Sequence, residues 1–128
     1  MHPAPGAFRI LVADDEPSLG RLLRESLTRA GHKVEISEDG RDALRRYRPG
    51  TYDLLILDSM LSHRSGLEVI AHIRDSGDVI PIILTSASLE SGRVESFAFT
   101  YRVELLHKPF GVRDLRAAVD RAVRDSGR

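Results

Sequence analysis

The sequence predicts an α/β fold in which five parallel strands form one sheet and five helices cover its two faces. Two observations carry this prediction. Short apolar runs alternate with segments whose apolar residues recur at helical spacing, which is the pattern of successive β-α units. The third run, at residues 53–57, is apolar on both faces, as a central parallel strand should be. Right-handed crossovers then distribute the helices over both faces of the sheet.

The first third of the chain is expected to form a strand, a helix and a second strand. The first strand covers about residues 8–13. Pro17 suits the first turn of the next helix, where its missing N–H costs little, and Gly31 suits the position after its end. A short alternating strand follows, with Val34 and Ile36 on one face. The apolar residues at helical spacing in the first helix are Leu19, Leu22, Leu23, Leu27 and Ala30.

The middle of the chain continues the alternation. Asp39-Gly40 marks a turn, and the next helix runs until Pro49-Gly50 stops it. After the strand at 53–57 and a loop at 58–66, a third helix is expected to end near Gly77. The apolar residues that mark these two helices are Ala43, Leu44 and Tyr47, then Leu67, Val69, Ile70 and Ile73.

Two further units complete the chain. Residues 81–84 form the fourth predicted strand, and residues 89–99 form a weaker helix that we expect Gly92 to interrupt. Residues 103–106 form the fifth strand. The last helix is amphipathic, with apolar residues Val112, Leu115, Ala118, Val119, Ala122 and Val123.

Composition narrows the class of protein. A chain of 128 residues is long enough for one domain with one core. The absence of cysteine excludes thiolate metal sites and cysteine nucleophiles. Nineteen basic residues balance nineteen acidic ones, which leaves no electrostatic footprint for nucleic acid or for an anionic membrane.

The chain shows no sign of a membrane segment. Its longest apolar stretches are four or five residues, whereas a spanning helix needs about 20. The start lacks a basic region followed by an apolar one, so a secretory signal is not expected and a cytoplasmic protein is. We expect a flexible lead-in at residues 1–7, one domain at 8–125 and a short tail at 126–128.

Chemistry-bearing residues follow the ends of the predicted strands. They are Asp14, Asp15, Asp58, Thr85 and Lys108. Taken singly, each has a structural explanation, such as a helix cap, a turn or a solvated side chain. Ligands bind at the carboxyl edge of an open parallel sheet, and all five residues should meet there. Three clustered carboxylates repel each other unless a hard cation such as Mg²⁺ neutralises them. The pattern indicates a Mg²⁺-dependent site that receives a phosphoryl group on Asp58.

These residues and their motifs resemble the receiver domain of two-component response regulators over about residues 8–124. The matching elements are Asp14-Asp15, Asp58 within LILDSMLSHRSGLE, Thr85 within PIILTSA and Lys108 within LLHKPF. The resemblance implies a flavodoxin-like, doubly wound sheet in the order 2-1-3-4-5. It also implies a role for each site residue.

By that resemblance, Asp58 is the phosphoacceptor. Asp15 and Asp58 bind Mg²⁺ together with the backbone carbonyl of Met60, and Asp14 acts largely through bound water. Lys108 pairs with the phosphoryl group. The remaining implied features are a hydrogen bond from Thr85, a backbone N–H donor at Ser86 and a cis bond between Lys108 and Pro109.

The resemblance implies a signalling switch rather than an enzyme that turns over an external substrate. The phosphoryl donor is a partner histidine kinase or phosphotransfer protein, and the domain promotes its own phosphorylation and dephosphorylation. The output passes to a downstream protein through the fourth helix, fifth strand and fifth helix. The charged last helix suits either a homodimer through that surface or a solvated face.

Several positions depart from the family pattern. Leu105 replaces the aromatic residue that usually precedes the lysine by three positions, so the usual switch is incomplete. Ser62 replaces a customary proline, and Arg64 and Ser65 also differ, which suggests a more mobile loop or one that serves a special partner. Two other functions remain open. One is a degenerate receiver that binds proteins independently of phosphate, and the other is an aspartate-based phosphatase, which usually needs an acid where Met60 lies.

Overall fold

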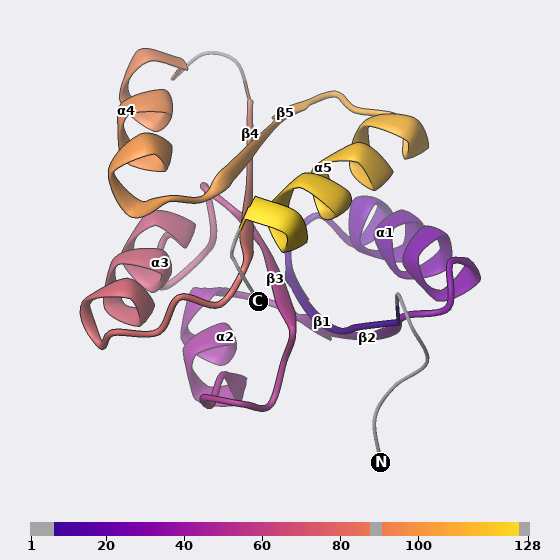
Figure 1. Ribbon diagram of the computed structural model, residues 1–128, viewed down its shortest axis with the longest axis horizontal. Coiled ribbons are helices and arrows are strands. Elements are labelled where there is room, and N and C mark those ends of the chain that lie inside the picture. Colours follow the sequence, from indigo (N-terminus) through magenta and orange to yellow (C-terminus); the bar gives the residue numbers. More distant parts are fainter. Residues whose placement is uncertain (1–6, 88–90, 126–128) are drawn as a thin grey trace.

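The structure, a computed structural model, describes residues 7–87 and 91–125 and has the predicted α/β architecture (Figure 1). Its five strands are all parallel and lie in the order β2-β1-β3-β4-β5. The strands are β1 (Arg9–Ala13), β2 (Lys33–Ser37), β3 (Leu54–Asp58), β4 (Ile82–Ala87) and β5 (Glu104–Lys108). The helices are α1 (Pro17–Arg29), α2 (Gly40–Arg46), α3 (Gly66–Asp75), α4 (Ser91–Tyr101) and α5 (Val112–Asp125).

The sheet separates two apolar cores. Along the central strand β3, Leu55 and Leu57 face the core under α2, α3 and α4, while Leu54 and Ile56 face the core under α1 and α5. Every residue of β3 is buried because side chains alternate between two covered faces. The fold is therefore three-layered, with the carboxyl ends of all strands at one edge (Figure 1).

Local sequence sets the ends of several helices. Pro17 begins α1, and Gly31 follows its C-cap with a φ of 99°, a conformation that glycine adopts without steric cost. Asp39 caps α2 by accepting a hydrogen bond from the Asp42 amide. Ser65 caps α3 in the same way by accepting from the Glu68 amide.

Three features differ from the sequence prediction. The prediction that Gly92 interrupts the fourth helix was wrong, because α4 passes through Gly92 in its first turn. The amides of a first turn have no intrahelical partner anyway, so a glycine disturbs little there. Strands β4 and β5 extend further than predicted, since Thr85 pairs with Leu106 and Ala87 with Lys108 in the ladder.

Some predicted segments lie outside the described residues. These are residues 1–6 of the expected lead-in, residues 89 and 90 of the expected helix, and the tail at 126–128. None of the helices within residues 7–87 and 91–125 is long and apolar enough to cross a membrane.

Candidate functional site

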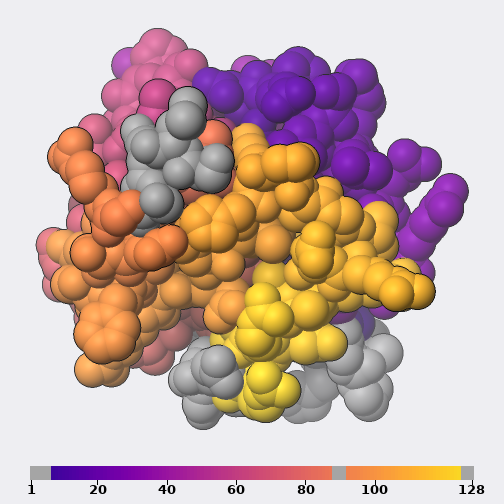
Figure 2. All heavy atoms as spheres, turned by 90° about the horizontal axis from the view of Figure 1, so that it is seen from above, coloured from indigo at the N-terminus to yellow at the C-terminus, as the bar shows by residue number. Residues whose placement is uncertain are grey.

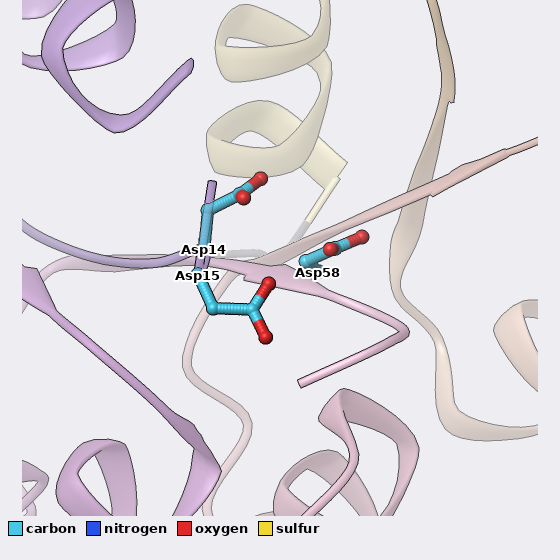
Figure 3. Close-up of side chains that lie close together, drawn as sticks. All are labelled: Asp14, Asp15 and Asp58. Carbon is cyan, nitrogen blue, oxygen red and sulfur yellow. The ribbon is translucent and has the colours of Figure 1, made fainter. Parts of the chain in front are cut away.

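Three carboxylates meet at the carboxyl edge of the sheet (Figure 3). Asp14 and Asp15 directly follow β1, and Asp58 is the last residue of the neighbouring strand β3. One oxygen of each carboxylate lies within 4.8 Å of an oxygen of the other two. Asp14 and Asp58 are buried, at 5% and 6% exposure, whereas Asp15 is exposed. The adjacency of β1 and β3 is what brings residues so distant in sequence together.

Lys108 supplies the positive charge of the site. It ends β5, and its Nζ lies 3.2 Å from Asp14 Oδ2 and 3.3 Å from Asp58 Oδ2. Burial alone would lower the pKa of Lys108, but attraction by Asp58 and Asp14 outweighs it and raises that pKa. The lysine therefore stays protonated and bridges two of the three acids.

One lysine does not balance three acids. Burial is the main cause that raises the pKa of Asp58, with repulsion from Asp14 and Asp15 adding to it and Lys108 opposing it. A site with excess negative charge, built from carboxylate oxygens, matches the donors that Mg²⁺ prefers. The three acids thus fit a hard divalent cation.

Thr85 lies beside the Asp58 carboxylate. It pairs with Asp58 across the β3–β4 ladder, and its Oγ1 is 3.4 Å from Asp58 Oδ1, a long contact for a hydroxyl donor. The peptide bond between Lys108 and Pro109 is cis. The structure therefore gathers Asp14, Asp15, Asp58, Thr85 and Lys108 at one point.

Two other predicted residues lie near this point without a side-chain contact to the acids in the described part of the chain. The Ser86 hydroxyl is buried and contacts the Ser59 hydroxyl at 3.3 Å and the Ala87 carbonyl at 3.1 Å. Met60 follows β3 by two residues, and this residue is 64% exposed. The side chains of Ser86 and Met60 therefore do not add to the cluster of acids in the described residues.

The sequence did not reveal one further contact. The Ser62 hydroxyl donates a hydrogen bond of 3.0 Å to Asp15 Oδ2. The only signal in the sequence was that Ser62 occupies the place of a customary proline. That departure from the family pattern does not indicate that the Ser62 hydroxyl contacts Asp15.

A model of the response regulator receiver domain matches residues 10–120. The chain belongs to this family. Among curated proteins, the uncharacterized transcriptional regulatory protein YrkP of Bacillus subtilis is 40% identical over 113 residues, covering 88% of this chain and 48% of YrkP. The response regulator MprA of Mycolicibacterium vanbaalenii is 37% identical over 124 residues, covering 93% of the chain and 53% of MprA. The receiver chain thus spans about half the length of these relatives.

Solved structures show the same fold. The receiver domain of the Francisella response regulator 1452 matches with a TM-score of 0.83 and 22% identity, covering 93% of this chain and 98% of that one. The response regulator TrrA of Thermotoga maritima, solved in complex with Mg²⁺-BeF, matches with a TM-score of 0.77 and 34% identity. The match covers 89% of this chain and 97% of the TrrA chain. The flavodoxin-like order 2-1-3-4-5 expected from the sequence is confirmed.

Proposed function

We propose that this receiver is a phosphoryl-accepting switch. Asp58 takes a phosphoryl group from a partner histidine kinase or phosphotransfer protein in a Mg²⁺-dependent reaction, and the modified domain changes its protein–protein contacts. The observation that carries the proposal is the meeting of Asp14, Asp15, Asp58 and Lys108 at one edge of the sheet. We take residues 8–125 as the functional unit.

The transfer uses the Asp58 carboxylate as nucleophile. A carboxylate oxygen forms a bond to phosphorus while the P–N bond to the donor imidazole breaks, and the nitrogen keeps the electron pair. Lys108, already 3.3 Å from Asp58, pairs with the incoming phosphoryl oxygens. Thr85 Oγ1 and the Ser86 backbone N–H are the proposed neutral donors to the same group. The protein mainly supplies position and electrostatics, as in other phosphoryl transfers.

Asp15, Asp58 and the Met60 backbone carbonyl are the proposed Mg²⁺ ligands, with Asp14 acting largely through bound water. When bound, the cation neutralises charge on the phosphoryl oxygens. The Mg²⁺-BeF complex of TrrA supports this assignment by similarity. The convergence of three carboxylate oxygens in this chain supports it directly.

The proposed output surface comprises α4, β5 and α5, whose orange-to-yellow atoms cover much of the near face in Figure 2. It would contact a downstream protein or a second copy of the chain. Arg121 on α5 already pairs with Glu104 on β5 within one copy. YrkP is named a transcriptional regulatory protein and is about twice as long as this chain, so any DNA binding would belong to another domain.

Intact mass tests the proposal. The protein is incubated with acetyl phosphate and Mg²⁺ beside an Asp58→Ala control. We expect a gain of one phosphoryl group that is lost without Mg²⁺ and lost in the variant. A folded protein that binds Mg²⁺ yet gains nothing would contradict the proposal and favour a binding module that works without phosphate.

A further inference from the structure

One exposed side chain of the loop between β3 and α3 forms a hydrogen bond with the acidic cluster of Asp14, Asp15 and Asp58. Ser62 lies in this loop, and its hydroxyl donates to Asp15 Oδ2 at 3.0 Å. The other two acids are held by several groups. Asp14 accepts from Lys108 and from the Glu16 amide, and Asp58 contacts Lys108 and Thr85. In the described part of the chain, Ser62 is the one hydrogen-bond partner of the Asp15 carboxylate.

The backbone of the loop is itself fixed in place. The Ser62 carbonyl accepts hydrogen bonds from the Gly40 amide at 3.2 Å and from the Arg64 amide at 2.7 Å. A Cβ atom on Gly40 would lie 1.7 Å from the Arg64 carbonyl oxygen, so the start of α2 and this loop are in direct backbone contact. The Ser62 hydroxyl is therefore presented from a main chain whose carbonyl accepts two hydrogen bonds.

We propose that Ser62 is a positioning residue that orients Asp15 for Mg²⁺. The inference rests on the Mg²⁺ site proposed above. An exposed carboxylate rotates among several orientations, and a ligand that must first be ordered binds a metal less tightly. Outer partners that hold ligating carboxylates contribute to metal affinity for this reason. Ser62 performs that task in a place where the family usually has proline, which carries no hydroxyl.

The hydrogen bond does not prevent cation binding. A carboxylate has two oxygens and about four lone-pair sites. Asp15 can thus accept from Ser62 through Oδ2 and still offer the cation an electron pair. The hydroxyl carries no charge, so it leaves the net charge of the cluster unchanged.

The test is the dissociation constant for Mg²⁺ alone, measured calorimetrically without any phosphoryl donor. Ser62→Ala should weaken Mg²⁺ binding by roughly three- to tenfold. This is at or below the low end of the loss in metal affinity usual for removal of an outer hydrogen-bond partner, because the bond from Ser62 is exposed. Ser62→Thr keeps the hydroxyl and should restore most of the affinity. Ser18→Ala is the matched control, since the exposed Ser18 also donates to a carboxylate, that of Glu16, outside the cluster.

Each outcome has a separate meaning. Equal or tighter Mg²⁺ binding by Ser62→Ala would overturn the role of Ser62 while leaving the cation site intact. Equal weakening in Ser62→Ala and Ser62→Thr would also overturn it, because the hydroxyl would then not be the cause. A wild-type protein that binds no Mg²⁺ would contradict the cation site itself, and the role of Ser62 with it.

Discussion

At the scale of single residues, burial gives the three acids different properties. Asp58 and Asp14 are buried beside Lys108, whereas Asp15 is exposed and depends on Ser62. Burial raises the pKa of Asp58, so its charged form is less favourable in the folded, metal-free domain than in the unfolded chain. The charged Asp58 side chain therefore lowers the stability of the fold at neutral pH, a conflict that is common at functional sites.

Asp58→Asn should stabilise the metal-free protein near neutral pH. Since the folded pKa of Asp58 lies above its unfolded value, the folded state binds more protons, and stability falls as pH rises through that range. Asparagine removes this loss, so the free energy of unfolding should rise by about 1 kcal/mol, a usual size for one stabilising substitution. At acid pH, where Asp58 is protonated in both states, the difference should vanish.

Urea unfolding at the two pH values measures this effect. Glu38→Gln on the exposed surface is a control for loss of one negative charge. A wild-type protein more stable than Asp58→Asn near neutral pH without metal would contradict the argument. It would mean that the Lys108 pair outweighs burial and repulsion.

At the scale of elements, Arg74 joins the ends of α3 and α4. Its guanidinium lies at the end of α3 and donates to four backbone carbonyls, those of Asp78, Ile80, Tyr101 and Arg102, at 2.7–3.2 Å. Arg102 has a φ of 57°, in the turn that ends α4. Burial lowers the pKa of Arg74 and attraction by Asp78 opposes this. Arg74 thus joins the C-terminal end of α4 to α3 and to the segment that leads into β4.

Arg74→Met should destabilise the fold while keeping a similar side-chain length. Four carbonyls lose their charged donor in this variant. The free energy of unfolding should fall by only about 2–3 kcal/mol, because water can reach some of the four carbonyls. The urea midpoint measures the loss. Arg24→Met on the exposed face of α1 is the control. Arg74→Lys should recover only part of the lost stability, because an ammonium group lacks the planar geometry of a guanidinium. If the urea midpoints of Arg74→Met and Arg24→Met were equal, the hydrogen bonds of Arg74 to the four carbonyls would contribute nothing to stability.

The sequence predicted the elements wherever one local pattern determined them. Apolar runs, and alternation in β2, identified the strands, and Pro17 and Gly31 marked the ends of α1. Local pattern failed at Gly92, since a glycine in a first turn looks the same in sequence as one that breaks a helix. It also could not reveal Arg74, whose partners are turn carbonyls brought together only by packing.

The candidate site shows the same division. Asp14, Asp15, Asp58 and Lys108 could be predicted because each closes an apolar run, and parallel strands place their ends at one edge. The hydrogen bond from Ser62 to Asp15 joins residues 47 apart in sequence. It depends on the path of an irregular loop, which no periodicity describes.

At the scale of the whole molecule, the order of the strands brings the residues of the site together. The order β2-β1-β3-β4-β5 puts Asp58 between the acids that follow β1 and the hydroxyl of β4. Lys108 reaches Asp14 across 94 residues of sequence. A phosphoryl group on Asp58 would add nearly two negative charges at this edge. Leu105 is partly buried against the core under α2, α3 and α4.

The most direct measurement identifies the modified residue. The protein is treated with acetyl phosphate and Mg²⁺, then reduced with borohydride, which converts an aspartyl phosphate to homoserine, and the peptides are sequenced by mass spectrometry. We expect homoserine at position 58 alone, and none when Mg²⁺ is withheld. Homoserine at Asp14, Asp15 or another acid, with position 58 unchanged, would contradict the central claim that Asp58 is the acceptor.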